Sequence, residues 1–277
     1  MFLNLWESFV AFVLGLVEGL TEFAPVSSTG HMIIVDDFLF QSKELFSPAV
    51  ANTFKIVIQL GSILAVVVVM WGRFMSLLGL NRRKERSPFE PRLNLLQVIV
   101  GLIPAGVLGV LFNDYIDEYL FSTKTVVVGL VLGAILMIAA DWFRPRRPRA
   151  ETVDQITYGQ AFAVGLIQCL SLWPGFSRSG STISGGVLAG MSHRAAADFT
   201  FIMAVPIMAG ASFLSLLKSW DSITMEAVPF FIIGFISAFV FALISIRFFL
   251  KLINRIKLVP FAIYRLVLAA VIFFVFL

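Results

Sequence analysis

The feature that most constrains this sequence is a set of six long, predominantly apolar stretches. A helix needs roughly 20 such residues to cross the hydrocarbon core of a bilayer. The whole chain is 59% hydrophobic and only 14% charged, a composition that soluble domains rarely have. We therefore predict an all-α integral membrane protein. The expected transmembrane helices are residues 54–72, 93–113, 123–143, 198–217, 228–250 and 258–277.

Two further apolar regions are interrupted near their middle by proline. Residues 6–40 are broken near Pro25, and residues 159–190 are broken at Pro174-Gly175. Each piece is short and carries polar residues close to the break. Broken backbone at membrane depth is tolerated where protein or a watery cavity surrounds it. We therefore expect two re-entrant helical hairpins beside the six transmembrane helices.

The two interrupted regions resemble each other. When the sequence is shifted by 150 positions, identical residues coincide at Gly15, Leu16, Leu20, Ser27, Gly30 and Ile33. Each region is followed by three predicted transmembrane helices, and because three is odd, the second copy would be inserted upside down. We predict one membrane domain, residues 1–277, built from inverted-topology repeats at about residues 1–143 and 155–277. Such folds place their site at the repeat interface, near the membrane midplane.

The charges of the expected loops divide into two sets. Glu7 and the acidic loops lie on one side; the loops are residues 36–52, 114–124 and 218–227. The basic loops lie on the other side and are residues 73–92, 144–158 and 251–257. Because cytoplasmic loops carry an excess of Lys and Arg, we expect both termini to face outward. The orientation would be the same if the first interrupted region crossed the membrane twice.

Composition also excludes some classes of function. The net charge is only +4, and the basic residues cluster in short loops, so nucleic acid is not an expected partner. The single cysteine, Cys169, leaves no disulfide and no cysteine-based metal site.

Two acidic residues of the first interrupted region lie on one helix face. Glu18 and Glu22 are four residues apart, so their side chains project in the same direction. The pair suits a divalent cation shared with phosphate oxygens or general acid–base chemistry. The alternative is a neutral, hydrogen-bonded pair that only stabilises the helices. The matching residues of the second region are Gln168 and Leu172, so one copy alone is acidic.

Hydroxyls and a histidine follow the first break. Ser27, Ser28 and Thr29 come just before His31. A Ser or Thr before a helix is an ordinary N-cap, and a lone histidine in an apolar segment is often only hydrogen-bonded. Their place beside two acids favours a catalytic role, with His31, Ser27 or an activated water as the attacking group. Ser28 and Thr29 are expected to bind substrate.

The second break contains a glycine-rich and hydroxyl-rich tip with one arginine. Its expected substrate-binding residues are Gly175, Ser177, Arg178, Ser179 and Thr182. Glycine lets the backbone approach a ligand, and the guanidinium is always charged and matches phosphate oxygens. The alternative role for the arginine is an ion pair with one of the two glutamates. Two other polar residues lie in the apolar stretches. Gln59 is expected to line the cavity or to bond a neighbouring helix. Arg265 is expected to reach the membrane surface or to cap a helix.

These motifs resemble those of a known family. E-G-L-T-E at 18–22, P-V-S-S-T-G-H at 25–31 and P-G-F-S-R-S-G-S-T at 174–182 closely resemble the motifs of the undecaprenyl-pyrophosphate phosphatase family, also called the bacitracin resistance protein family. The resemblance covers nearly the whole chain, including I-Q-L-G-S-I-L-A-V-V-V at 58–68 and F-A-I-Y-R at 261–265.

The resemblance implies an enzyme of the bacterial inner membrane. Such an enzyme removes the terminal phosphate of undecaprenyl pyrophosphate and so recycles the lipid carrier for peptidoglycan and related polymers. It also implies Mg²⁺ or Ca²⁺ held by Glu18 and Glu22, a catalytic histidine at His31, and a substrate-binding segment from Pro174 to Ser179. The family's site opens to the periplasm, which agrees with the orientation from the loop charges.

A carrier is the alternative function. Inverted repeats with a midplane site are typical of transporters, so the protein could transport or flip an anionic polyprenyl lipid. Acidity in one copy alone favours the enzyme. The expected partners are the lipid substrate and the bilayer, and the small residues from Gly185 to Gly190 would also suit a homodimer.

Overall fold

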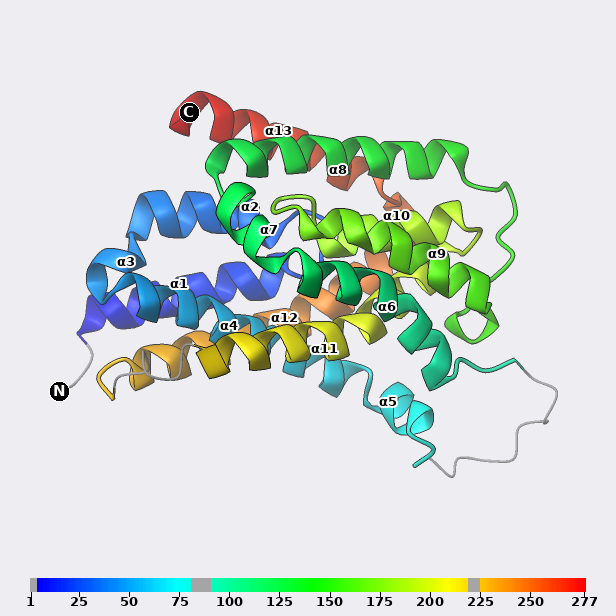
Figure 1. Cartoon of the computed structure of the whole chain (residues 1–277), viewed down its shortest axis with the longest axis horizontal. Helices are drawn as coiled ribbons and strands as arrows, with labels where there is room; N and C mark the ends of the chain where they lie inside the picture. Colours follow the sequence, from blue (N-terminus) through cyan, green and yellow to red (C-terminus); the bar gives the residue numbers. More distant parts are fainter. Residues whose placement is uncertain (1–3, 81–90, 219–224) are drawn as a thin grey trace.

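The computed structural model describes residues 4–80, 91–218 and 225–277, and the regular elements of this part of the chain are helices (Figure 1). In chain order they are α1 (Leu5–Thr21), α2 (Ser28–Met32), the π-helix η1 (Ile33–Phe40), α3 (Ser42–Leu45), α4 (Pro48–Val69), α5 (Trp71–Leu77), α6 (Leu95–Leu111), α7 (Asn113–Tyr119), α8 (Thr123–Phe143), the 3₁₀ turn η2 (Val153–Gln155), α9 (Tyr158–Gln168), the 3₁₀ turn η3 (Cys169–Leu172), α10 (Arg178–Leu188), α11 (His193–Lys218), α12 (Val228–Ile256) and α13 (Val259–Phe276).

Five of the described helices are long and apolar enough to cross a membrane: α4, α8, α11, α12 and α13. The chain is therefore a multi-pass integral membrane protein. The stretch expected at residues 93–113 forms α6, an apolar helix of 17 residues with Pro104 inside it.

Local capping explains where the helices differ from the expected ranges. α4 begins six residues before the predicted stretch, because Ser47 Oγ accepts the N–H of Val50 and Pro48 occupies the first turn. Proline fits that position because the first turn leaves its N–H groups unpaired. α11 likewise begins at His193, where Ser192 Oγ accepts the N–H of Ala195.

Both interrupted regions fold back on themselves. α1 ends at Thr21 and α2 begins at Ser28, and η3 ends at Leu172 before α10 begins at Arg178. Figure 1 shows α1 and the α2–η1 segment reaching the middle of the molecule from one end, and α9 and α10 reaching it from the other. The two turns, which we call the first tip (residues 22–29) and the second tip (residues 173–179), meet there.

The two halves of the chain pack against each other in matching pairs. α1 packs on α12, and α9 packs on α6. Glycines allow both close crossings: a Cβ at Gly15 would collide with the carbonyl oxygen of Gly234, and a Cβ at Gly165 would collide with that of Gly101. Gly15 and Gly165 are 150 residues apart, so the same crossing is made at the same place in both copies of the motif.

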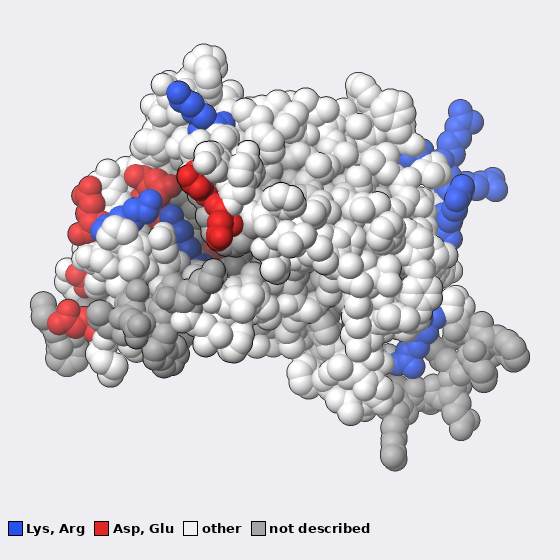
Figure 2. Space-filling view, viewed as in Figure 1, with Lys and Arg blue, Asp and Glu red and all other residues white. Residues whose placement is uncertain are grey.

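Charged side chains gather at the two ends of the molecule. On the face shown in Figure 2, acidic residues lie near α1, α3 and α7, and Lys and Arg dominate the opposite end. The basic residues Arg82, Arg83, Lys84 and Arg86, and the acidic Asp221, lie outside the described part of the chain.

Candidate active site

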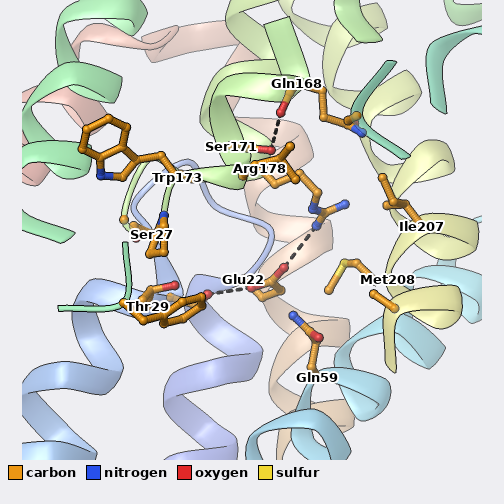
Figure 3. A pocket seen from close by; sticks show the side chains of 18 residues that line it. Glu22, Ser27, Thr29, Gln59, Gln168, Ser171, Trp173, Arg178, Ile207 and Met208 are labelled. Atoms are coloured by element: carbon orange, nitrogen blue, oxygen red, sulfur yellow. Dashed lines mark hydrogen bonds and ion pairs between the residues drawn. The ribbon is translucent and has the colours of Figure 1, made fainter. Parts of the chain in front are cut away.

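A cavity of about 290 Å³ with a mixed polar and apolar lining lies between the two tips. The second tip and the end of α9 form one wall, and α4, α6 and α11 close the remaining sides (Figure 3). The wall from the first tip consists of Glu22, Ser27, Ser28 and Thr29. Residues from both halves of the sequence therefore face one cavity.

Each tip contains a serine with an unusual backbone conformation just before the following helix. Ser27 precedes α2 with a φ of 71°, and Ser177 precedes α10 with a φ of 70°. Positive φ is costly for a residue with a Cβ and persists only where the surrounding structure holds it. Each Oγ accepts the N–H three residues later, from Gly30 at 3.4 Å and from Gly180 at 3.2 Å. Both serines are therefore N-caps that fix the same turn in both halves.

An ion pair joins the two tips across the cavity. Arg178 Nη2 donates to Glu22 Oε1 at 3.2 Å, the contact drawn in Figure 3, and both side chains are mostly buried. Glu22 Oε2 accepts a 2.6 Å hydrogen bond from Ser28 Oγ. Arg178 Nη1 is buried and has no hydrogen-bond partner among the described residues. The carboxylate is thus placed to take a proton from Ser28, and the arginine keeps one donor for an anion.

Glu18 lies one helical turn before Glu22 and is only 5% exposed. It does not line the cavity, but it lies within electrostatic range of Glu22, Arg178 and Lys55. The described chain adds no third acidic, histidine or cysteine ligand at this place. Two carboxylates are nonetheless the donor set that suits Mg²⁺, which takes its other ligands from water and substrate phosphates.

His31 lies behind the cavity wall rather than on it. Its Nδ1 is 2.7 Å from the carbonyl oxygen of Ser27, which can only accept, so Nδ1 carries a proton. In the neutral ring, Nε2 then accepts from the hydroxyl of Tyr264 at 2.7 Å, and the two rings stack. Both ring nitrogens are therefore occupied, and the ring fixes the Ser27 carbonyl. Tyr264 was not singled out from the sequence, although F-A-I-Y-R contains it.

The predicted residues of the second tip divide into two groups. Gly175 and Ser177 line the cavity. Ser179 and Thr182 are buried beneath it: Ser179 Oγ donates to the carbonyl oxygen of Ala24 at 3.1 Å, and Thr182 Oγ1 donates to the first carbonyl of α10 at 2.8 Å. The bond from Ser179 connects the second tip to the first tip, and the bond from Thr182 stabilises the start of α10.

Arg265 is fully buried, so the expectation that it reaches the membrane surface is wrong. Its Nη2 donates to the carbonyl oxygens of Gly129 (3.2 Å), Gly175 (2.9 Å) and Phe176 (2.9 Å). A Cβ at Gly133 would collide with the guanidinium, so the glycine makes room for it. Arg265 therefore holds the backbone of the second tip immediately before its cap serine. The sequence signal was present, because an ionisable residue inside an apolar helix marks a functional region by default.

Comparisons with known proteins agree with these motifs. The family model described as "Bacitracin resistance protein BacA" matches residues 11–271. A protein of Geobacillus sp. (strain WCH70) named undecaprenyl-diphosphatase is 72% identical over 274 residues, which cover 99% of this chain and 100% of that protein. The undecaprenyl-diphosphatase of Bacillus subtilis (strain 168) is 64% identical over 270 residues, 97% of this chain and 98% of that protein. The chain therefore belongs to the BacA family of bacitracin resistance proteins.

Proposed function

We propose that this protein is an undecaprenyl-diphosphatase, which hydrolyses undecaprenyl diphosphate to undecaprenyl phosphate and inorganic phosphate in the membrane. The name of its relatives supports the reaction. The observation that carries the proposal to this chain is the hydrogen-bonded array of Ser28, Glu22 and Arg178, which faces a cavity among apolar helices.

The membrane arrangement in this proposal has six transmembrane helices and two re-entrant hairpins. α6 is the sixth crossing helix, and α1–η1 and α9–α10 are the hairpins of an inverted repeat. The matching glycine crossings and the shared conformation of Ser27 and Ser177 support the repeat. The acidic end faces the periplasm and the basic end the cytoplasm, so the termini and the opening of the site are periplasmic.

The lining of the cavity is mixed, and Figure 3 places Ser27 and Thr29 on one side of Glu22 and the apolar Ile207 and Met208 on the other. We call these the polar side and the apolar side. The diphosphate occupies the polar side, and the prenyl chain leaves over the apolar side toward the bilayer. The terminal phosphate lies next to Ser28.

Ser28 is the nucleophile, because it is the hydroxyl of the first tip that contacts a base. Glu22 takes the Ser28 proton as Oγ attacks the terminal phosphorus. The bond from that phosphorus to the bridging oxygen breaks, and undecaprenyl phosphate leaves. Water then hydrolyses the phosphoserine and releases inorganic phosphate. Arg178 stabilises the charge on the phosphate oxygens, which is the main source of catalysis in phosphoryl transfer.

The proposal includes a divalent cation, Mg²⁺ or Ca²⁺. Glu18 and Glu22 would hold it through their carboxylate oxygens. When bound, it would neutralise charge on the diphosphate. His31 and Tyr264 act indirectly in this scheme: they fix the carbonyl of Ser27 and so the position of the next residue, Ser28.

The deciding experiment measures phosphate release from undecaprenyl diphosphate by the purified protein in detergent, with and without EDTA, for the wild type and Arg178→Ala. The proposal requires release by the wild type, suppression by EDTA and loss in the variant. Movement of labelled lipid across liposomes with no release of phosphate would favour a carrier instead.

A further inference from the structure

Gln168, the last residue of α9, carries a buried side-chain amide whose N–H group is not used by its neighbours in the described structure. The side chain is 1% exposed and lines the cavity, yet Nε2 has no hydrogen-bond partner among the described residues. Buried polar groups are nearly always paired in native proteins, so an exception requires a reason. Arg178 also lines this cavity, and its Nη1 is likewise buried and unpaired among the described residues. Two free N–H donors on residues that line one cavity fit an anion with several oxygens.

A second glutamine of α9, Gln160, has a side-chain amide with a structural role and serves as a comparison. Gln160 is also buried, but its Nε2 donates to the carbonyl oxygen of Ala189 at 3.1 Å. Its Oε1 accepts the N–H of Thr157 at 3.0 Å and closes a capping box. The free amide of Gln168 is therefore a feature of the cavity and not of the helix.

The repeat supplies the chemical reason for an amide at this place. Gln168 corresponds to Glu18 after the shift of 150 positions. A third carboxylate beside the cavity would repel a diphosphate, whereas an amide N–H can donate to it. The change from acid to amide therefore adds a binding group to the second half.

The position of Gln168 selects one of the two phosphates. In Figure 3 its side chain extends to the side where Ile207 lies, and Ser27 and Thr29 lie on the other side of Glu22. Leu172, one turn after Gln168, is apolar and also lines the cavity. The phosphate that carries the prenyl chain must lie nearest the apolar side, and the terminal phosphate must lie near the serines.

Resting on the proposed function, we infer that Gln168 is a substrate-binding residue for the prenyl-linked phosphate. Its Nε2–H donates to an oxygen of that phosphate, in undecaprenyl diphosphate and in the product undecaprenyl phosphate. Gln168 thus binds the leaving group, while Ser28 and Glu22 act on the terminal phosphate.

The test compares ligand binding and stability in Gln168→Met, which keeps the size of the side chain and removes the N–H. Undecaprenyl phosphate and, separately, inorganic phosphate are titrated against the full-length protein in detergent, and the thermal midpoint is followed, since a ligand raises it according to its affinity. We expect affinity for undecaprenyl phosphate to fall about tenfold, the usual scale for a hydrogen bond to a charged group. Affinity for inorganic phosphate should change less than about twofold. The ligand-free midpoint should stay equal or rise, because an unpaired buried group has been removed.

Gln160→Met is the matched control. It breaks the bond to Ala189, so its ligand-free midpoint should fall while both affinities stay within about twofold of the wild type. Gln168→Glu is the second variant. Its carboxylate should repel the phosphate, so it should weaken the binding of undecaprenyl phosphate more than Gln168→Met does.

Unchanged affinity for undecaprenyl phosphate in Gln168→Met, equal losses for both ligands, or a lower ligand-free midpoint would overturn the inference. Because the titrations need no turnover, they decide the role of Gln168 even if the wild type releases no phosphate. A wild type that releases no phosphate would refute the proposed function and not the role of Gln168.

Discussion

At the start of α2 and at the start of α10 the backbone is alike and the chemistry is different. Ser27 and Ser177 have the same positive φ and cap the same N–H, three residues later. The next residue is Ser28 in the first tip and Arg178 in the second. One turn thus presents a hydroxyl, and its duplicate presents a cation.

The difference shows how a duplicated turn can form one asymmetric site. Phosphoryl transfer needs a nucleophile with a base and also positive charge on the phosphate oxygens. The first half supplies Ser28 and Glu22, and the second supplies Arg178, so neither half is sufficient. The ion pair between Glu22 and Arg178 holds the two parts together when no substrate is bound.

Ser28→Ala tests the first half of this comparison and should have the largest effect. Removal of a nucleophile should lower kcat at least about 1,000-fold, measured as phosphate release. Rapid quenching with labelled substrate should trap a phosphoserine in the wild type and none in the variant. A label that remains in Ser28→Ala and disappears in His31→Ala would assign the attack to the histidine.

Arg178→Ala tests the second half. Loss of a preorganised charge contact should lower activity at least about 100-fold. Arg178→Lys keeps the charge and loses the planar fork, so it should recover only part of the activity. Turnover of Arg178→Ala close to that of the wild type would remove the arginine from the site.

Glu18→Gln tests whether the acidity of the first half binds metal. Removal of one carboxylate should raise the Mg²⁺ concentration for half-maximal activity about tenfold or more. The measurement is a Mg²⁺ titration after EDTA treatment, with Glu7→Gln as a control at the exposed N-terminal end of α1. The same titration curve in Glu18→Gln and wild type would reject the metal role of Glu18.

Tyr264→Phe should have the smallest effect and sharpens the assignment of His31. It removes the hydroxyl bonded to Nε2 and keeps the stacked ring. Because His31 acts through the Ser27 carbonyl in this scheme, activity should fall only about three- to tenfold, the scale of one ordinary hydrogen bond. A loss as large as that of Ser28→Ala would mean that the Tyr264 hydroxyl takes part in the chemistry.

Much of this fold could be predicted because the bilayer imposes a length and a composition on helices. Five of the predicted stretches coincide with long apolar helices. The helices begin at other residues than predicted because caps such as Ser47 set their ends, and a hydropathy pattern gives no information on caps. The expectation for Arg265 was wrong for a related reason. The sequence shows that a charged residue lies in an apolar helix, but not that carbonyl groups of α8 and of the second tip accept its hydrogen bonds.

The roles within the site depend on contacts between distant residues. Three hydroxyls follow Pro25, and from the sequence Ser27 was a candidate attacking group whereas Ser28 was expected to bind substrate. The turn of the first tip favours Ser28 instead, because it directs Ser28 Oγ to Glu22 and makes Ser27 a cap. His31 was one of three candidate attacking groups on the basis of its neighbours in sequence, and its hydrogen-bond partner Tyr264 is 233 residues away.

The sequence by itself determined that this protein is a helical membrane protein, that it repeats one motif, and which residue types could handle a diphosphate. These follow from local composition and spacing, because the bilayer and the chemistry of phosphate each demand particular side chains. Only the tertiary structure decided that Glu22 meets Arg178 across the cavity, that His31 lies behind the wall, and that Gln168 Nε2 has no hydrogen-bond partner in the part of the chain that the structure describes. Those facts depend on contacts between segments 156 residues apart (Glu22 and Arg178) or 233 residues apart (His31 and Tyr264), and no local sequence pattern specifies such contacts.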